Sequence, residues 1–517
     1  MEENRNVPWT DQYERTTVRP APVLPFFPTG KKEGIFGVFI VVFSVFLANC
    51  MIYAGVNLGF SIALLGSSAA AVVYLWRSGC KGTWYGWTLL SLSAVIIPGF
   101  ARTDDGFVKF VMSCFLFVGV NLGLCDVAGK TVWNTSSVRS LLDCFRTAFV
   151  LTIGRISYAF RGISIMLQSG GTAAKNGMAV LLGAVIAIPV LAILIPLLMS
   201  ADAAFQGLLE LLPEFELEEL LATLIVGCGL ACLGYTRAVA LRHDPKINNN
   251  YANLRKGLNA ITVNTVLGAV CAVYVVYLAS QLAYFVGGFS GILPEEFTVA
   301  EYARRGFFEM AWICVINLTV MILAISFTEK KQGRSPLSIR LLCLFIGIVT
   351  LFLVVAAGAK MVLYIGSFGM TRLRVLTMVI MAFLGLTTAV VSLWLFAPKL
   401  PYMKIVVLSA MILGAAVLWT DVDSVVAKYN VDNYLSGQLE NVDIPHLKSL
   451  GSGAVPHVHR LAQEASDKKV REKAESALTH LAYQHKIQDF RDWNYVEAIA
   501  EIILEQYKPE SGRRLTV

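Results

Sequence analysis

The chain contains eleven segments that stay apolar for about 20 residues, the length that an α-helix needs to cross the hydrocarbon core of a bilayer. Hydrophobic residues make up 56% of the sequence and charged residues 15%, whereas a soluble domain has about 25% charged residues. We therefore predict an all-α, polytopic membrane protein. The expected spans are about 34–54, 56–76, 83–101, 107–127, 177–199, 218–236, 259–286, 307–327, 340–366, 375–396 and 402–420.

The charges between these segments predict how the chain is inserted. Basic residues gather in alternate connections, and such connections stay on the cytoplasmic side. The N-terminal segment belongs to this basic side, so residues 1–33 are expected to be a flexible cytoplasmic leader. The transmembrane domain then covers residues 34–421, and an odd number of spans places residues 422–517 outside the cytoplasm. The net charge of +7 follows the insertion pattern, so nucleic acid is not an expected partner.

The cytoplasmic segment 128–176 is long for a connection. Its apolar middle is interrupted by Arg139, Arg146, Arg155 and Arg161, which leave no run of 18 apolar residues. We interpret it as an amphipathic interfacial segment whose arginines lie among anionic lipid headgroups.

Residues 422–517 change to water-soluble helical patterns, with apolar residues three and four positions apart. They predict a small extracytoplasmic α-helical domain. Five of the six histidines lie there, but His457 and His459 would point to nearly opposite faces of a helix. The ten cysteines form no disulfide framework, and we interpret Cys228 and Cys232, one helical turn apart in an apolar span, as buried apolar side chains rather than a metal pair. We expect no metal and no cofactor.

Polar residues from several connections fall on the predicted outer side of the membrane. Within 281–317, Glu301, Arg305 and Glu309 are four apart and share one face if this segment is helical. These residues favour either a structural ion-pair network or a binding site for an anionic ligand such as a lipid phosphate, which suits the planar fork of arginine. The candidate binding residues are Asp202, Gln281, Glu301, Arg304, Arg305, Glu309, Lys360, Tyr364, Thr371, Arg374, Asp421 and Asp423.

Several of these motifs also resemble a known family. The segments QLAYFVGG, AEYARRGFFE, KMVLYIGSFGMTRLR and AKYNVDNYL, with IPHLKSLGSGAVPHVHRLA, are similar to blocks of a bacterial multi-pass membrane family catalogued as domain of unknown function 4173, which is related to number 4153. The resemblance runs from about residue 180 to near 500 and implies the bacterial plasma membrane, but no activity. Lys360 stands where the family pattern has arginine, so a role there that needs a guanidinium is not implied.

The leading functional hypothesis is a non-catalytic envelope protein with a binding, sensory or scaffolding role. Its partners would be the lipid bilayer, an anionic lipid or other envelope component, and a protein that contacts the C-terminal domain. One alternative is a transporter or channel for a small or anionic substrate. Another is an enzyme for a lipid-linked substrate, with Glu301 or Asp421 as acid or base and Arg304 and Arg374 holding a phosphate. The sequence identifies no catalytic residue, because it contains none of the common hydrolase or metalloprotease motifs.

Overall fold

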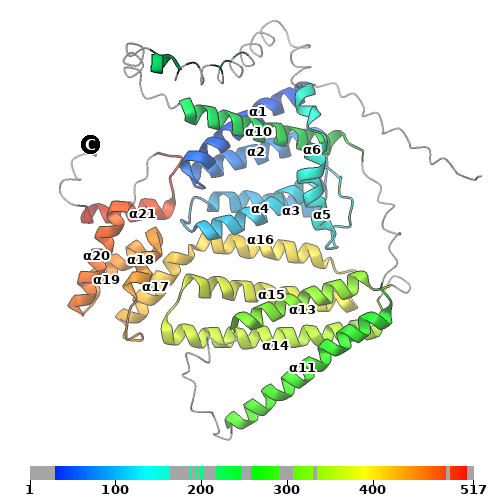
Figure 1. The fold of residues 1–517 in the computed structure, drawn as a ribbon, viewed down its shortest axis with the longest axis vertical. Helices are drawn as coiled ribbons and strands as arrows, with labels where there is room; N and C mark the ends of the chain where they lie inside the picture. The colour runs from blue at the N-terminus through cyan, green and yellow to red at the C-terminus, as the bar shows by residue number, and fades with distance from the viewer. Residues whose placement is uncertain are drawn as a thin grey trace, which may run out of the picture.

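A computed structural model describes most of the 517 residues (Figure 1). The described residues are 30–162, 183, 187, 190, 194, 197–201, 217–245, 258–289, 307–329, 335–484 and 489–508. Within these ranges the regular structure is helical, apart from one isolated parallel bridge between Leu258 and Thr328.

Nine helical stretches in the described ranges are long and apolar enough to cross a membrane, which confirms the prediction of a polytopic α-helical membrane protein. They are formed by α1 (Lys31–Asn49) with η1 (Cys50–Ala54), α2 (Leu58–Arg77), α4 (Gly106–Val127), α10 (Leu217–His243), α11 (Ala260–Phe289), α13 (Phe307–Phe327), α14 (Leu337–Phe368), α15 (Arg372–Phe396) and α16 (Tyr402–Thr420). The expected span at 83–101 corresponds to the 16-residue helix α3 (Trp84–Gly99), and the expected span at 177–199 lies largely outside the described residues.

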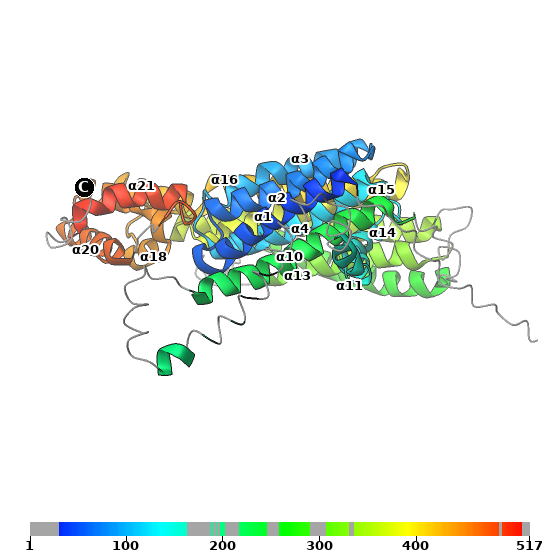
Figure 2. The same cartoon turned by 90° about the horizontal axis from the view of Figure 1, so that it is seen from above.

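The long helices lie side by side, and α16 joins two groups of them (Figure 1). One group contains α1, α2, α3, α4 and α10, and the other contains α11, α13, α14 and α15. Helix α16 packs against α3 and α4 on one side and against α15 on the other. Figure 2 shows the same helices from above, with the C-terminal helices beyond one end of the bundle.

Small residues allow the closest helix contacts. A Cβ on Gly227 of α10 would lie 2.6 Å from the Cα of Val45 in α1, and one on Gly123 of α4 would lie 2.8 Å from a side-chain carbon of Leu90 in α3. Helix packing in lipid depends on such close van der Waals contact, because the hydrophobic effect does not drive apolar helix surfaces together there.

The C-terminal residues form a compact group of helices with its own core. Its helices are α17 (Val422–Leu435), α18 (Ile444–Ser449), α19 (Val455–Glu464), α20 (Lys468–Gln484) and α21 (Tyr495–Leu504), with short 3₁₀ turns η4 (Gly451–Ala454) and η5 (Glu505–Tyr507). Fully buried Val426, Leu447, Leu461 and Leu478 belong to this core, and Met370 of the bundle packs against it. We call these helices the C-terminal domain.

The opposite end of the bundle carries basic side chains from several connections. There Arg242 of α10 pairs with Glu33 of α1, and Arg155 pairs with Asp244 at 2.8 Å. The short helices α5 (Ser140–Phe145), η2 (Arg146–Leu151) and α6 (Thr152–Gly154) run across the direction of the spans near this end (Figure 1). Their place at the membrane interface stays a prediction.

Candidate functional site

The most concentrated group of buried charges that the structure describes lies where the C-terminal domain meets the bundle. It centres on Arg372, the first residue of α15. Its guanidinium donates from Nε to Oδ1 of Asp423 and from Nη2 to Oδ2, both at 2.6 Å, and its Nε lies 3.0 Å from Oδ2 of Asp105. The side chains of Asp423 and Asp105 are 3% and 2% exposed, and that of Arg372 is 34% exposed. One arginine therefore joins α15, α17 and the N-terminus of α4.

Local backbone chemistry positions these three residues. Thr371 caps α15, because its Oγ1 accepts from the backbone N–H of Arg374 at 3.4 Å. Asp105 caps α4 by accepting from the N–H groups of Phe107 and Val108 at 2.8 and 3.1 Å. The carboxylate of Asp105 thus has one oxygen on a helix N-terminus, which favours negative charge, and the other facing Arg372.

Asp421 sits at the boundary between α16 and α17. Its φ of 50° is a left-handed conformation, which lets the chain turn from the last span into the C-terminal domain. Its Oδ1 accepts from Oγ1 of Thr103 at 3.4 Å, whereas its Oδ2 is buried without a hydrogen-bond partner. Burial, followed by the charge of Asp423, raises the pKa of Asp421 to about 7.

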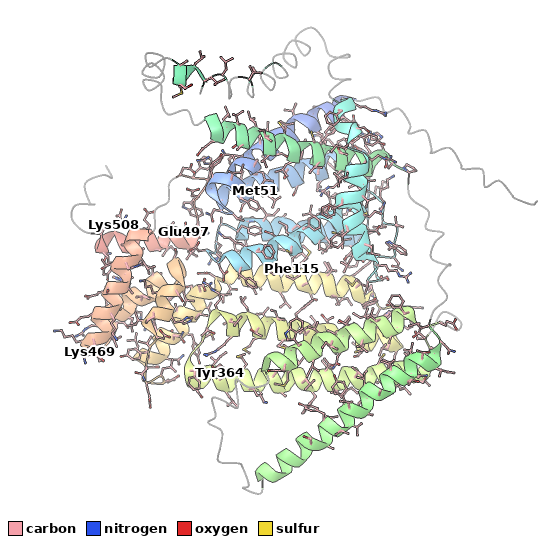
Figure 3. All side chains as sticks on the ribbon, in the orientation of Figure 1. Met51, Phe115, Tyr364, Lys469, Glu497 and Lys508 are labelled. Atoms are coloured by element: carbon pink, nitrogen blue, oxygen red, sulfur yellow. The ribbon has the colours of Figure 1, made fainter. Side chains whose placement is uncertain are left out.

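A second polar group lies beside the first. Nζ of Lys109 donates to Oδ1 of Asn57 at 2.7 Å, and Nδ2 of Asn494 donates to the carbonyl of Thr103 at 2.8 Å. Glu497 lies on α21 where this helix approaches the bundle (Figure 3). Burial raises the pKa of Glu497 to about 7. The neighbouring carboxyl group of Asp104 adds to this shift.

We call the two groups together the junction cluster. Its members are Asn57, Thr103, Asp104, Asp105, Lys109, Arg372, Asp421, Asp423, Asn494 and Glu497.

Three backbone hydrogen bonds also cross the junction. The N–H groups of Leu58 and Gly59, at the start of α2, donate to the carbonyls of Trp493 and Arg491 at 3.2 and 3.1 Å. The N–H of Tyr495 donates to the carbonyl of Ala101 at 2.7 Å. The C-terminal domain is therefore docked onto the ends of several spans.

Only some of the predicted binding residues belong to the part of the chain that the structure describes. Asp202, Glu301, Arg304 and Arg305 lie outside the described residues. Gln281 belongs to α11, but its side chain is likewise outside the description, and Glu309 is exposed in the first turn of α13. The expected face of Glu301, Arg305 and Glu309 thus stays a prediction.

Three other predicted residues meet at the corner between α14 and α15. The guanidinium carbon of Arg374 lies 4.0 Å from the ring centre of Tyr364, and its Nη1 donates to the carbonyls of Phe368 and Gly369. Thr371 is the cap of α15. Lys360 is half-buried in α14, one helical turn before Tyr364. These contacts are separate from the ion pairs of Arg372.

Several polar residues inside the bundle bond to neighbouring helices. Nδ2 of Asn317 in α13 donates to Oγ1 of Thr350 in α14 at 2.9 Å, and its Oδ1 accepts from the hydroxyl of Tyr274 in α11 at 2.5 Å. Nη1 of Arg237 in α10 donates to Oδ1 of Asn121 in α4 at 2.8 Å. Among the described residues, no group of three or more histidine, cysteine or carboxylate side chains is arranged to hold a metal ion.

Comparison with known protein families identifies a relationship over most of the chain. Residues 64–461 match the family described as domain of unknown function DUF4153. The chain belongs to this family. Number 4153 is the relative named in the sequence analysis, and membership of number 4173 stays a prediction. No curated protein and no solved structure matches the chain significantly.

The DUF4153 region contains only part of the junction cluster. It includes Asp105, Arg372, Asp421 and Asp423, and it ends within α19, before Asn494 and Glu497. Sequence reasoning selected both aspartates after α16 but missed Arg372, Asp105 and Glu497. The pair Asp104–Asp105 just before an apolar run was a signal for a helix cap, yet nothing in the local sequence indicates which cation it faces.

Proposed function

We propose that the protein is a non-catalytic sensory or scaffolding protein of the bacterial plasma membrane, whose C-terminal domain binds an envelope component outside the cytoplasm. The observation that carries this proposal is the docking of that domain through a half-buried arginine and two buried carboxylates. A domain joined to α15, α17 and α4 at one point can transmit a binding event to the spans, because packed helices move as rigid bodies.

The proposed orientation rests on the distribution of charge. The end of the bundle away from the C-terminal domain carries exposed or half-buried basic side chains in successive connections. They include Lys32, Arg77, Lys81, Lys130, Arg139, Lys399 and Lys404. A basic end of this kind is retained in the cytoplasm. The C-terminal domain, at the other end, would then face the envelope.

The contacts inside the bundle favour this role over transport. A transport path needs polar groups that can exchange partners with a substrate. Asn317 instead joins α11, α13 and α14 through Tyr274 and Thr350, and Asn264 of α11 donates to Ser338 of α14 at 3.0 Å. These are the interhelical hydrogen bonds that stabilise membrane bundles.

The enzyme alternative also receives less support. Its acid or base Asp421 is only 5% exposed, and Arg374 faces Tyr364 and two backbone carbonyls rather than a carboxylate. A phosphate-holding arginine beside an accessible acid would need both groups at one open surface.

The proposal is tested by photo-crosslinking in intact bacterial cells. A photoreactive residue at Ile502, which is 73% exposed on α21, should form an adduct with a cell-wall polymer, lipid headgroup or envelope protein. The control position is Val355 in α14, 71% exposed on a span, where adducts with lipid acyl chains are expected.

A protease-sensitive tag fused after Val517 shows on which side of the membrane the C-terminal domain lies. The tag should be cleaved in intact cells, as an extracytoplasmic control is. Protection of the tag until the membrane is opened, or envelope adducts at Val355 but not at Ile502, would overturn the proposal.

A further inference from the structure

The junction cluster is unbalanced in charge. Its carboxyl groups are Asp104, Asp105, Asp421, Asp423 and Glu497, and the cations that face them are Arg102, Lys109 and Arg372. If all these groups were ionised, the five carboxylates would exceed the three cations, with Arg102 counted among them, by two charges. Unpaired buried charge is costly because the low-dielectric interior cannot replace water. Binding of two protons would remove the imbalance.

Geometry indicates where one of these protons would reside. Asp423 is satisfied, because it accepts two hydrogen bonds from Arg372. Asp105 is held by two helix N–H groups and the same arginine. Asp421 accepts from the hydroxyl of Thr103 through Oδ1, and the backbone N–H of Ser424 and the charge of Arg102 also favour its anion, but its Oδ2 is buried without a hydrogen-bond partner. Asp421 is therefore the carboxyl of this group that is least stabilised as an anion.

The pair of carboxyl groups formed by Glu497 and Asp104 is where we expect the second proton to bind. Glu497 faces Asp104, whose negative charge raises the pKa of Glu497, and a proton on either carboxyl group would remove the repulsion between them. Lys109 is the cation that faces Glu497, and its ammonium also donates to Asn57. The pair joins α21 of the C-terminal domain to the loop between α3 and α4.

We propose that the junction cluster is a proton-binding site, in which Asp421 and Glu497 each hold a proton while the C-terminal domain is docked. On undocking, both carboxyl groups reach water and release their protons to it. Docking of the domain is thus coupled to pH. The biological use of this site rests on the sensory role proposed above, but the docking equilibrium itself does not.

The titration behaviour agrees with the geometry. The pKa of Asp421 and that of Glu497 are both raised to about 7, mainly by burial, from ordinary carboxyl values near 4. A raised pKa in the docked state means that docking is strongest at low pH and weakens as pH rises through about 7. Each such group lowers the docking constant about tenfold between pH 6 and pH 8, so that both together lower it about 100-fold.

Burial also raises the pKa of Asp423, against the lowering effect of Arg372, so this carboxyl shares the direction of the dependence, but the histidines of the C-terminal domain do not. His446 and His457 belong to the C-terminal domain, and burial lowers the pKa of both below 6.5. They would gain protons only at lower pH, where charging a buried imidazole opposes docking. Asp492 adds negative charge near Glu497 and raises its pKa further, and Asp489 pairs with Arg491.

The experiment is hydrogen exchange of the full-length protein in lipid nanodiscs at pH 6 and pH 8, corrected for the intrinsic effect of pH. The amides of Leu58, Gly59 and Tyr495 report docking, since their hydrogen bonds cross the junction. Their protection should fall about 100-fold between pH 6 and pH 8. In the double variant Asp421→Asn, Glu497→Gln, whose amides mimic protonated carboxyls, protection should change less than threefold.

The variants suit the site. Asparagine tolerates the left-handed backbone of residue 421, so Asp421→Asn adds no strain there. The matched control is Glu440→Gln, which removes an exposed carboxylate of the C-terminal domain and should keep the wild-type pH dependence. If the double variant fails to fold, the wild-type measurement and the single variant Asp421→Asn decide the question.

Two results would overturn the proton site: equal protection of the wild type at both pH values, or a full pH dependence in the folded double variant. Neither result would affect the envelope adducts expected at Ile502. Conversely, pH-dependent protection without those adducts would retain the proton site and refute the proposed function.

Discussion

Removal of the arginine at the centre of the junction gives the sharpest test of how the C-terminal domain is held. In Arg372→Gln, Asp423 and Asp105 would stay buried, at 3% and 2% exposure, without their cation. Loss of one partner from a fully buried ion pair costs about 3–5 kcal/mol. Arg372 is 34% exposed and water reaches its guanidinium, so we expect its removal to cost less than in a fully buried pair, about 2–3 kcal/mol.

This loss of docking free energy can be measured as faster hydrogen exchange of the amides at the junction. Hydrogen exchange of Leu58, Gly59 and Tyr495 at pH 7 follows the opening of the junction. Since about 1.4 kcal/mol corresponds to a tenfold change in an equilibrium constant, protection of these amides should fall about 30- to 150-fold. Arg372→Lys keeps the charge but loses the two-pronged contact with Asp423, so it should give an intermediate loss.

The matched control is Arg460→Gln. Arg460 also contacts two carboxylates, Asp432 and Glu464, but these groups are about half exposed on the domain surface. Such pairs contribute about 0–1 kcal/mol, so the control should leave junction protection within a few-fold of the wild type. Equal effects of Arg372→Gln and Arg460→Gln would refute the reasoning, because burial would then have made no difference.

Two further changes test the elements that support the site. Gly369→Ala should destabilise the protein by about 1–3 kcal/mol in thermal unfolding, because φ is +74° and the new Cβ would lie 2.6 Å from Oδ1 of Asn430; unchanged stability would mean that this turn is adaptable. Asn317→Leu should cost about 1–2 kcal/mol, because it removes the hydrogen bonds to Tyr274 and Thr350, and Gly268→Ala on the open side of α11 is the neutral control. A stable Asn317→Leu protein with altered solute flux in proteoliposomes would instead support the transport alternative.

The membrane class could be predicted from composition because a span requires about 20 apolar residues in a row, which is a property of the chain itself. Each span in the described part of the chain that the sequence predicted corresponds to a helix, including the short α3. The polar junction was predicted only in part. Asp421 and Asp423 were selected, but of the two arginines in the first turn of α15 Arg374 was selected and Arg372 was not.

The helix period explains this difference. Residues 372 and 374 are two positions apart and therefore point in directions about 200° apart on α15. Arg372 faces Asp423, and Arg374 faces Tyr364. Which of the two faces the C-terminal domain depends on the rotation of α15, which its packing against α14 and α16 determines.

The sequence by itself determined that the chain crosses a membrane many times, because apolar length and the alternation of basic connections are local properties. It also determined that the region after Asp421 is helical and polar. Only the tertiary structure decided that α21 returns to the starts of α2 and α4, and that Asp105 and Asp423 are buried beside one arginine. Burial and charge pairing depend on residues hundreds of positions apart, so no local pattern could reveal the shifted pKa values of Asp421 and Glu497.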